Sequence, residues 1–234
     1  MRDFSFQTGN PSEVIKEYKG VPLKRSSIHR LQPGVWLDDE LINYFAELVA
    51  SSEDPHQDSF KILSTFFYTK LMEHEVYSYE KVSRWMFRMK LDIFALEELF
   101  IPINVANSHW IAVTVSMTRK TLELYDPGVV GNHLNARIRC LDMIFNYIKD
   151  EHLTQKGAEL IDESSWRRHI LPESLPKQPN SDDCGVFVSA FIYHSACNTH
   201  FRLPVNVAPI AFAADLRFQF VRSMMNNTIH NLRN

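Results

Sequence analysis

The segment Gln178-Pro-Asn-Ser-Asp-Asp-Cys184-Gly185, followed at once by Val-Phe-Val-Ser-Ala-Phe-Ile-Tyr at residues 186–193, carries the strongest structural signal in the chain. Residues with turn and N-cap preferences precede a cysteine, and an unbroken apolar run follows it. This order predicts a loop that delivers Cys184 to the first turn of a buried helix. A thiol there faces backbone N–H groups and the positive end of the helix dipole, which favour thiolate over thiol. Cys184 is therefore a candidate nucleophile.

A free cysteine is more often a small buried hydrophobe than a reactive group. We apply that interpretation to Cys140 and Cys197. Cys184 differs because Gln178 stands six residues before it, and because a His-Trp pair and an Asp-Pro pair lie upstream at the ends of strand-like runs. The combination, rather than the Cys-Gly pair alone, indicates a catalytic site.

The composition is that of an enzyme-sized globular protein. The 234 residues, 45% of them hydrophobic and 12% aromatic, suit one large domain or two small ones. We find no linker or repeat and expect one domain over residues 1–234. A net charge of −3 offers no basic field for nucleic acid. No apolar stretch of about 20 residues and no signal-peptide core are present, so we expect no membrane partner and an intracellular protein.

The cysteines and histidines do not suggest a disulfide framework or a metal site. Three cysteines are an odd number and are widely spaced. None of the ten histidines forms a His-x-x-x-His pair, and the set His194, Cys197 and His200 lacks a second half-site. The sequence predicts no metal and no other cofactor.

The first half of the chain is predicted to be largely helical. Acidic residues open a helix after Trp36, which lies at its start, where the alternative role for the indole is a hydrophobic staple. The apolar positions of that helix recur with helical spacing at Leu41, Ile42, Phe45, Leu48 and Val49. We also expect a short strand at 18–23, a second segment at 26–31, and helices at 60–72 and 79–89.

The second half is predicted to contain a sheet. Strands are expected at 99–103, where Pro102 indicates an edge or a bulge, and at 110–116 and 121–126, joined by a turn at 117–120. Antiparallel pairing of the last two brings His109 and Asp126 to the same end of the sheet. A helix at 132–149, a strand at 166–171, the Cys184 helix and a final helix at 210–225 complete an α+β domain.

Cysteine-protease chemistry needs a thiolate, an imidazole, a group that orients the imidazole, and donors for the oxyanion. Cys184, His109, Asp126 and Gln178 supply one of each. Their order along the chain is not that of papain, in which the cysteine precedes the histidine, but geometry rather than order defines such a site.

These motifs resemble the ubiquitin-like-protein-specific proteases, the sentrin/SUMO protease family. The resemblance rests on His109-Trp110, Tyr125-Asp126 and the segment 178–185, together with the stretches 36–43 and 92–103, and it covers about residues 30–225. It implies a papain-like α+β fold with permuted order and a central mixed or antiparallel sheet flanked by helices. By the same resemblance, His109 is the base, Asp126 its orienting partner, Gln178 the oxyanion donor and Cys184 the nucleophile.

The resemblance also implies the substrate. Trp36 and Trp110 resemble a pair that roofs a tunnel for the Gly-Gly tail of a modifier. Only glycine would pass through, because a slot between indole faces leaves no room for a Cβ. Asp39 and Asp183, with Asp38, would line the approach and meet an arginine-rich face of the modifier; the alternative for these carboxylates is helix capping and loop solvation. The expected partners are a SUMO-like modifier and its lysine-linked conjugates, bound by a monomeric enzyme in the nucleus or cytoplasm.

Three alternatives stay open. The first is specificity for ubiquitin or the neddylation modifier, since Ser181 and Pro127 stand where many members carry glycine and serine. The second is acyl transfer from a thioester, against which the Trp36/Trp110 pair argues. The third is a non-catalytic module that binds a ubiquitin-like protein, which is weakened because every catalytic position is filled.

Overall fold

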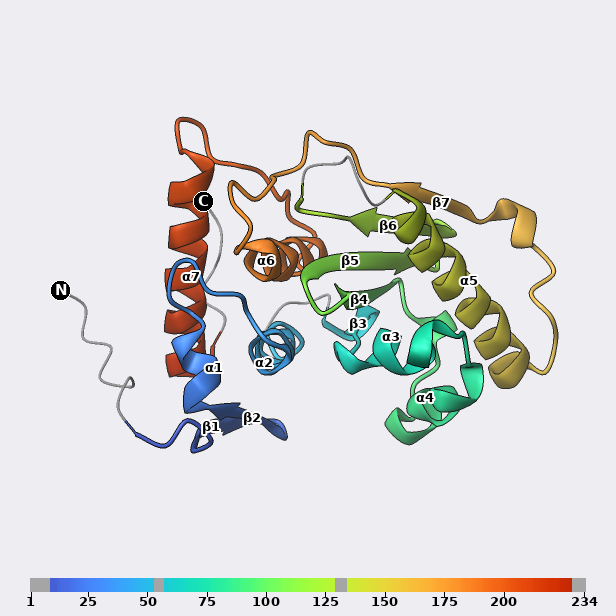
Figure 1. The fold of residues 1–234 in the computed structure, drawn as a ribbon. Helices are drawn as coiled ribbons and strands as arrows, with labels where there is room; N and C mark the ends of the chain where they lie inside the picture. The colour runs from blue at the N-terminus through green and yellow to red at the C-terminus, as the bar shows by residue number, and fades with distance from the viewer. Residues whose placement is uncertain (1–8, 53–56, 129–133, 229–234) are drawn as a thin grey trace.

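A five-stranded mixed sheet forms the centre of the protein (Figure 1). The computed structural model describes residues 9–52, 57–128 and 134–228. The outer pairs of the sheet, β3 with β4 and β6 with β7, are parallel, and the inner pairs are antiparallel. In sheet order the strands are β3 (Phe60–Ile62), β4 (Glu98–Val105), β5 (His109–Ser116), β6 (Thr121–Tyr125) and β7 (Arg167–Ile170).

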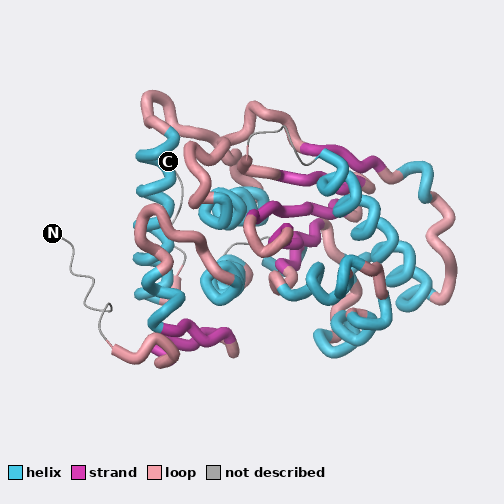
Figure 2. Tube along the Cα trace, viewed as in Figure 1, coloured by secondary structure: helices cyan, strands magenta, loops and turns pink. Residues whose placement is uncertain are grey.

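Helices cover both faces of the sheet, as the tube in Figure 2 also shows. Side chains of β5 alternate between two core clusters because successive residues of a strand point to opposite faces. Trp110 and Ala112 belong to the cluster formed with α2 (Asp39–Val49), α6 (Cys184–Ala196) and α7 (Pro209–Asn226). In the other cluster, Ile111, Val113 and Val115 of β5 pack against α3 (Phe66–Leu71), α4 (Ser83–Met89) and α5 (Leu134–Lys156).

The N-terminal part is a β-hairpin followed by a short helix. Strands β1 (Val14–Tyr18) and β2 (Val21–Lys24) pair antiparallel, and α1 (Arg25–His29) follows. The expected single strand at 18–23 is therefore wrong, because Lys19 and Gly20 adopt positive φ and form the hairpin turn. Short 3₁₀ turns are found at Gln57–Ser59, Glu73–Glu75, Tyr79–Lys81, Ile93–Ala95 and Glu163–Ser165.

The helix expected at 60–72 is corrected to a strand followed by a helix. The segment Phe60–Ile62 buries its two outer side chains and pairs parallel with Glu98–Phe100. Tertiary pairing thus overrides the local apolar pattern. The expected helix at 79–89 is also divided, into a 3₁₀ turn at Tyr79–Lys81 and α4.

Other predicted elements are confirmed. All five apolar positions expected to face the core from α2 are buried, and Asp38 caps this helix by accepting a hydrogen bond from Leu41 N at 3.1 Å. Pro102 is in β4, beyond the residues that pair with β3. Its lack of an N–H therefore costs no hydrogen bond to β3. Pro209 is the first residue of α7.

The helix expected at 132–149 begins at Leu134 and extends to Lys156, and residues 132–133 lie outside the described part. Leu134 and Ile138, near the start of this helix, are exposed. The strand expected at 166–171 is β7. Within the described ranges, none of the helices is long and apolar enough to cross a membrane.

Candidate active site

His109 and Asp126 meet at one end of the sheet, as the strand pattern predicts. His109 is the first residue of β5, and Asp126 follows the last residue of the neighbouring antiparallel strand β6. His109 Nε2 lies 2.8 Å from Asp126 Oδ1. The carboxylate is 2% exposed and the imidazole 30%, so the pair reaches from the interior to the surface.

Cys184 is the first residue of α6, as the sequence predicts. It is 1% exposed, and it lies near enough to His109 to contribute to the raised pKa of that imidazole. Because Asp126 occupies Nε2 of the ring, Nδ1 is the ring nitrogen that remains for the thiol. The first four backbone N–H groups of an α-helix have no partner within the helix. In α6 the side chain of Asp183, at the N-cap, makes no capping bond to them. The first turn of α6 thus leaves donors beside the sulfur.

The surroundings of His109 favour its charged form. Burial by itself lowers the pKa of His109, but the interactions with Asp126 and Cys184 outweigh it and raise the pKa to about 9. Burial by itself raises the pKa of Asp126, because it also disfavours the charged form of a carboxylate. The contacts with His109, Gly128 and Arg137 more than offset this, so the pKa of Asp126 is lowered. An ionised carboxylate therefore holds an imidazolium beside Cys184.

Asp126 has further partners that the sequence reasoning missed. Its Oδ1 accepts the backbone N–H of Gly128 at 2.7 Å, and its Oδ2 accepts Arg137 Nε at 2.6 Å. Lys177 Nζ donates to its carbonyl oxygen at 2.7 Å. A signal for Arg137 did exist, because it lies four residues before Leu141 on the buried face of α5, where a charged residue is out of place.

The loop before Cys184 is braced by Asn180. Its Oδ1 accepts the backbone N–H groups of Asp182 at 3.0 Å and Asp183 at 3.1 Å, and its Nδ2 donates to Asp183 Oδ2 at 2.8 Å. Gln178 is tied to the same region, since its backbone N–H donates to Pro127 O at 2.9 Å and its side-chain amide donates to the carbonyl of Asn180. Gln178 Oε1 is buried without a partner among the described residues. These bonds hold the turn that presents the thiol.

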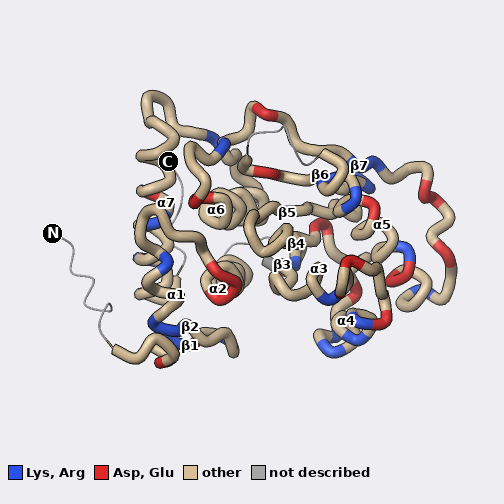
Figure 3. Tube along the Cα trace, in the orientation of Figure 1, with Lys and Arg blue, Asp and Glu red and all other residues tan. Residues whose placement is uncertain are grey.

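Asp183 is buried and paired within the protein, which contradicts its expected contact with a modifier. The residue is 3% exposed, and Arg217 of α7 binds its Oδ1 through Nε at 2.7 Å. A carboxylate that is buried against a guanidinium and an amide is not accessible to an external arginine. Asp183 instead fixes the loop to α7. Asp39 is half-buried at the start of α2, where Glu40 is also acidic (Figure 3).

The two tryptophans occupy different environments. Trp110 is 3% exposed and donates Nε1–H to Leu37 O at 3.0 Å, so it presents no open face, contrary to the expected slot. Trp36 is 41% exposed and donates Nε1–H to Asp182 Oδ1 at 3.2 Å. Only Trp36 of the pair presents an accessible indole beside the Cys184 loop.

The other two cysteines lie away from this constellation. Cys140 is on α5 and Cys197 follows α6, and no disulfide joins any of the three cysteines, all of which are described. Burial raises the pKa of the Cys140 thiol and outweighs the lowering effects of Tyr68 and Arg139. The default interpretation of Cys140 as a structural residue therefore fits its surroundings.

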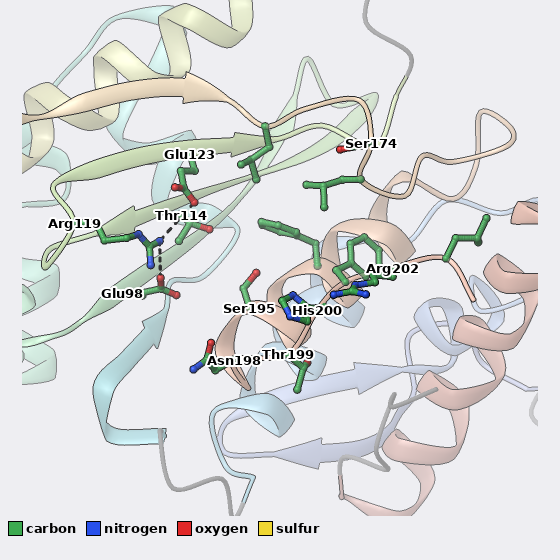
Figure 4. Close-up of a pocket in the computed structure, with 15 residues that line it drawn as sticks. Glu98, Thr114, Arg119, Glu123, Ser174, Ser195, Asn198, Thr199, His200 and Arg202 are labelled. Carbon is green, nitrogen blue, oxygen red and sulfur yellow. Dashed lines mark hydrogen bonds and ion pairs between the residues drawn. The ribbon is translucent and has the colours of Figure 1, made fainter. Parts of the chain in front are cut away.

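Two other kinds of site lie outside this constellation or are not formed by the described residues. Within residues 9–52, 57–128 and 134–228, no group of three or more His, Cys, Asp or Glu side chains is placed to hold a metal ion. A cavity of about 660 Å³ lies near Thr114 of β5 and Ser195 of α6 (Figure 4). On its wall Arg119 bridges Glu98 at 2.9 Å and Glu123 at 3.6 Å. None of the four candidate catalytic residues lines it.

Comparison with known proteins agrees with this geometry. Residues 35–212 match the model of the Ulp1 protease family, C-terminal catalytic domain. The chain is 31% identical over 194 residues to a putative ubiquitin-like-specific protease 1B of Arabidopsis thaliana, covering 78% of this chain and 54% of that protein. It is 29% identical over 185 residues to a sentrin-specific protease of Caenorhabditis elegans, covering 78% of this chain and 25% of that one.

A solved structure supports the fold. The C-terminal Ulp1 protease domain, determined by X-ray crystallography in complex with Smt3, the yeast ortholog of SUMO, superimposes with a TM-score of 0.76 at 22% identity, covering 97% of this chain and 93% of that chain. At that identity the likeness concerns the fold, and it confirms the papain-like α+β class. The chain spans 25% to 54% of the length of the two curated relatives described above.

Proposed function

The chain belongs to the Ulp1 protease family, whose C-terminal catalytic domain it matches, and we propose that it is a cysteine protease that cleaves after the C-terminal Gly-Gly of a SUMO-like modifier. The substrates are lysine-linked conjugates of that modifier, and also its precursor. One observation carries the proposal: an imidazole 2.8 Å from a buried carboxylate lies against a thiol in the first turn of a buried helix.

The first half of the reaction forms a thioester. The Cys184 thiolate attacks the carbonyl carbon of the last modifier glycine, and the negative charge passes to the carbonyl oxygen. The N–H groups of the first turn of α6 and the amide of Gln178 are the candidate donors to that oxygen. When the tetrahedral intermediate collapses, the C–N bond breaks and the His109 imidazolium gives its proton to the departing lysine amine.

The second half restores the enzyme. Neutral His109 removes a proton from a water molecule, and the resulting hydroxide attacks the thioester carbonyl. Collapse breaks the C–S bond, releases the modifier with a free carboxylate and regenerates the thiolate. Throughout, Asp126 keeps Nε2 of His109 engaged, so that Nδ1 remains directed toward the sulfur.

Trp36 is the residue that we expect to contact the Gly-Gly tail. Its exposed indole is anchored through Asp182 to the loop that precedes Cys184, so it lies at the approach to the thiol. Trp110 supports the site from beneath: a Cβ at Gly185 would lie 3.2 Å from Trp110 Cδ1 and 3.0 Å from Leu37 Cβ. Glycine at 185 thus permits the close packing of α6 on the tryptophan.

The half-buried Asp39 at the start of α2 is a candidate contact for a basic face of the modifier, since electrostatic complementarity steers such encounters. We also propose an intracellular location, in the cytoplasm or nucleus. The absence of a disulfide among the three described cysteines and the need for a reduced Cys184 favour a reducing compartment.

The experiment is a panel of C-terminal electrophile probes built on a SUMO-like modifier, ubiquitin and the neddylation modifier. We expect covalent capture of the SUMO-like probe by the wild type and by Cys197→Ser, and none by Cys184→Ser. A probe ending in Gly-Ala should react on the order of 10²-fold more slowly than one ending in Gly-Gly, since a misplaced carbonyl loses both attack geometry and oxyanion contacts. Preferential capture of ubiquitin would reassign the modifier, and capture by none of the probes would reject the function.

A further inference from the structure

Arg137 lies in the interior beside the candidate site although no step of the reaction described above uses it. It is in the first part of α5 and is 5% exposed. Arginine is rarely buried to that extent unless it is paired. Its Nε donates to Asp126 Oδ2 at 2.6 Å, whereas His109 lies on Asp126 Oδ1. The two oxygens of one carboxylate therefore bind two different cationic groups.

This division gives Arg137 a geometric effect on His109. The terminal torsion of an aspartate is broad and roughly two-fold, so a carboxylate held at only one oxygen can turn. Here Gly128 N–H and His109 hold Oδ1 while Arg137 holds Oδ2. The carboxylate plane is fixed from both sides, and with it the direction in which Nδ1 of His109 points.

Arg137 also has an electrostatic effect. A cation near a second cation disfavours the charged form of that neighbour. The charge of Asp126 alone would strengthen the imidazolium further, and the guanidinium on Oδ2 offsets part of that field. His109 must give up its proton to the leaving amine, so an imidazolium that is held too strongly would be a poorer acid.

We propose that Arg137 is a positioning residue, which fixes the plane of Asp126 and limits how strongly Asp126 holds the proton of His109. The inference rests on the proposed function, because it assigns Arg137 a role in the reaction of that site. The competing explanation is a structural ion pair that holds α5 to the end of β6. That role would affect folding without changing the titration of His109.

The test compares Arg137→Gln and Arg137→Lys with a control, Arg139→Gln. Arg139 is on the same helix, but its side chain is 51% exposed and contacts Glu75, so its replacement removes the same charge away from Asp126. Two quantities are measured on folded protein: the pH profile of kcat/KM on a modifier substrate, and the titration of the His109 ring by NMR, which needs no substrate.

We expect Arg137→Gln to lower kcat/KM about 10- to 100-fold and to raise the pH at which His109 titrates by on the order of one unit. Arg137→Lys should restore the wild-type titration, because it keeps the positive charge. Arg139→Gln should change neither quantity. An unchanged His109 titration in Arg137→Gln would overturn the proposal and leave a structural ion pair.

A second pair of variants covers the case in which Arg137→Gln does not fold, since breaking a buried ion pair leaves an uncompensated charge. Asp126→Asn/Arg137→Gln replaces both charges with amides. His109 should titrate at a higher pH in this double variant than in Asp126→Asn alone, because only the single variant keeps the cation. Equal titrations would contradict the proposal. If the wild type cleaved no modifier, the proposed function would fail, and the NMR comparison would still decide the effect of Arg137 on His109.

Discussion

Replacement of Arg217 should damage both stability and activity, because this one side chain holds together the two segments on either side of the site. It is 3% exposed and binds Asp183 Oδ1 through Nε at 2.7 Å and Nη2 at 2.6 Å. Its Nη1 donates to the backbone carbonyls of Arg30 and Gln32, and Nη2 also donates to those of Val35 and Asp182. Trp36 directly follows one of these segments, and Cys184 directly follows the other.

The magnitude follows from these contacts. Removing one partner of a buried ion pair costs about 3–5 kcal/mol, and in a chain of this size each kcal/mol lowers Tm by about 2–4 °C. Arg217→Met should therefore lower Tm by roughly 6 to 20 °C. The rate of probe capture at 20 °C should also fall, because the Cys184 loop loses its attachment to α7.

The assay is thermal unfolding followed by circular dichroism, with Arg222→Met as the control. Arg222 is an exposed residue of the same helix, and its replacement should change Tm by no more than about 2 °C, as is usual for surface substitutions. Equal and small losses of Tm in the two variants would show that Arg217 does not hold the two segments together.

Three further predictions concern the site itself. Gly185→Ala should lower stability by about 1–3 kcal/mol, measured by urea unfolding, because its Cβ would lie 3.0 Å from Leu37 Cβ; unchanged stability would mean that this packing yields easily. Since the pKa of His109 is raised to about 9, kcat/KM should fall as pH rises through about 9, and the stability that His109 contributes should be complete below about pH 6.5 and lost as pH rises through 9. In Asp126→Asn the fall in kcat/KM should begin at lower pH. A pH profile identical to that of the wild type would contradict the pairing of His109 with Asp126. Trp36→Ala should slow capture of a Gly-Gly probe with little change in Tm, because the indole is 41% exposed; Asp182→Ala should slow it less, and wild-type rates in both would exclude this tryptophan from the tail-binding surface.

The meeting of His109 and Asp126 could be predicted because it depends on regular features. Two adjacent strands with a four-residue turn pair antiparallel, and the start of one then lies beside the end of the other. The position of Cys184 was predictable for a similar reason, since a loop with capping residues precedes a long apolar run. These features are local, and the chain carries them in its residue pattern.

What the sequence could not supply depends on contacts between distant segments. The strand β3 has only three residues and is defined by its parallel pairing with β4, so local propensity favoured a helix. The burial of Trp110 follows from its bond to the carbonyl of Leu37 and from the packing of Gly185 against it. An aromatic residue beside a histidine gives no indication of which surface covers it.

Arg137 and Arg217 are intermediate cases. Each lies on the apolar stripe of its helix, Arg137 with Leu141 and Arg217 with Phe220. The helical period therefore predicts that each arginine is buried, and burial requires an anionic partner. Which aspartate each one binds depends on how the helices pack on the sheet, which the period alone does not determine.

Identification of the residue that carries the acyl group would test the proposed chemistry. The wild-type enzyme is mixed with a lysine-linked conjugate of a SUMO-like modifier, quenched in acid within the first turnover, digested and mapped by mass spectrometry. We predict a thioester between the C-terminal glycine of the modifier and Cys184, which hydroxylamine removes and which is absent from Cys184→Ser. A thioester on Cys140 or Cys197, or conjugate cleavage by Cys184→Ser at the wild-type rate, would contradict the account.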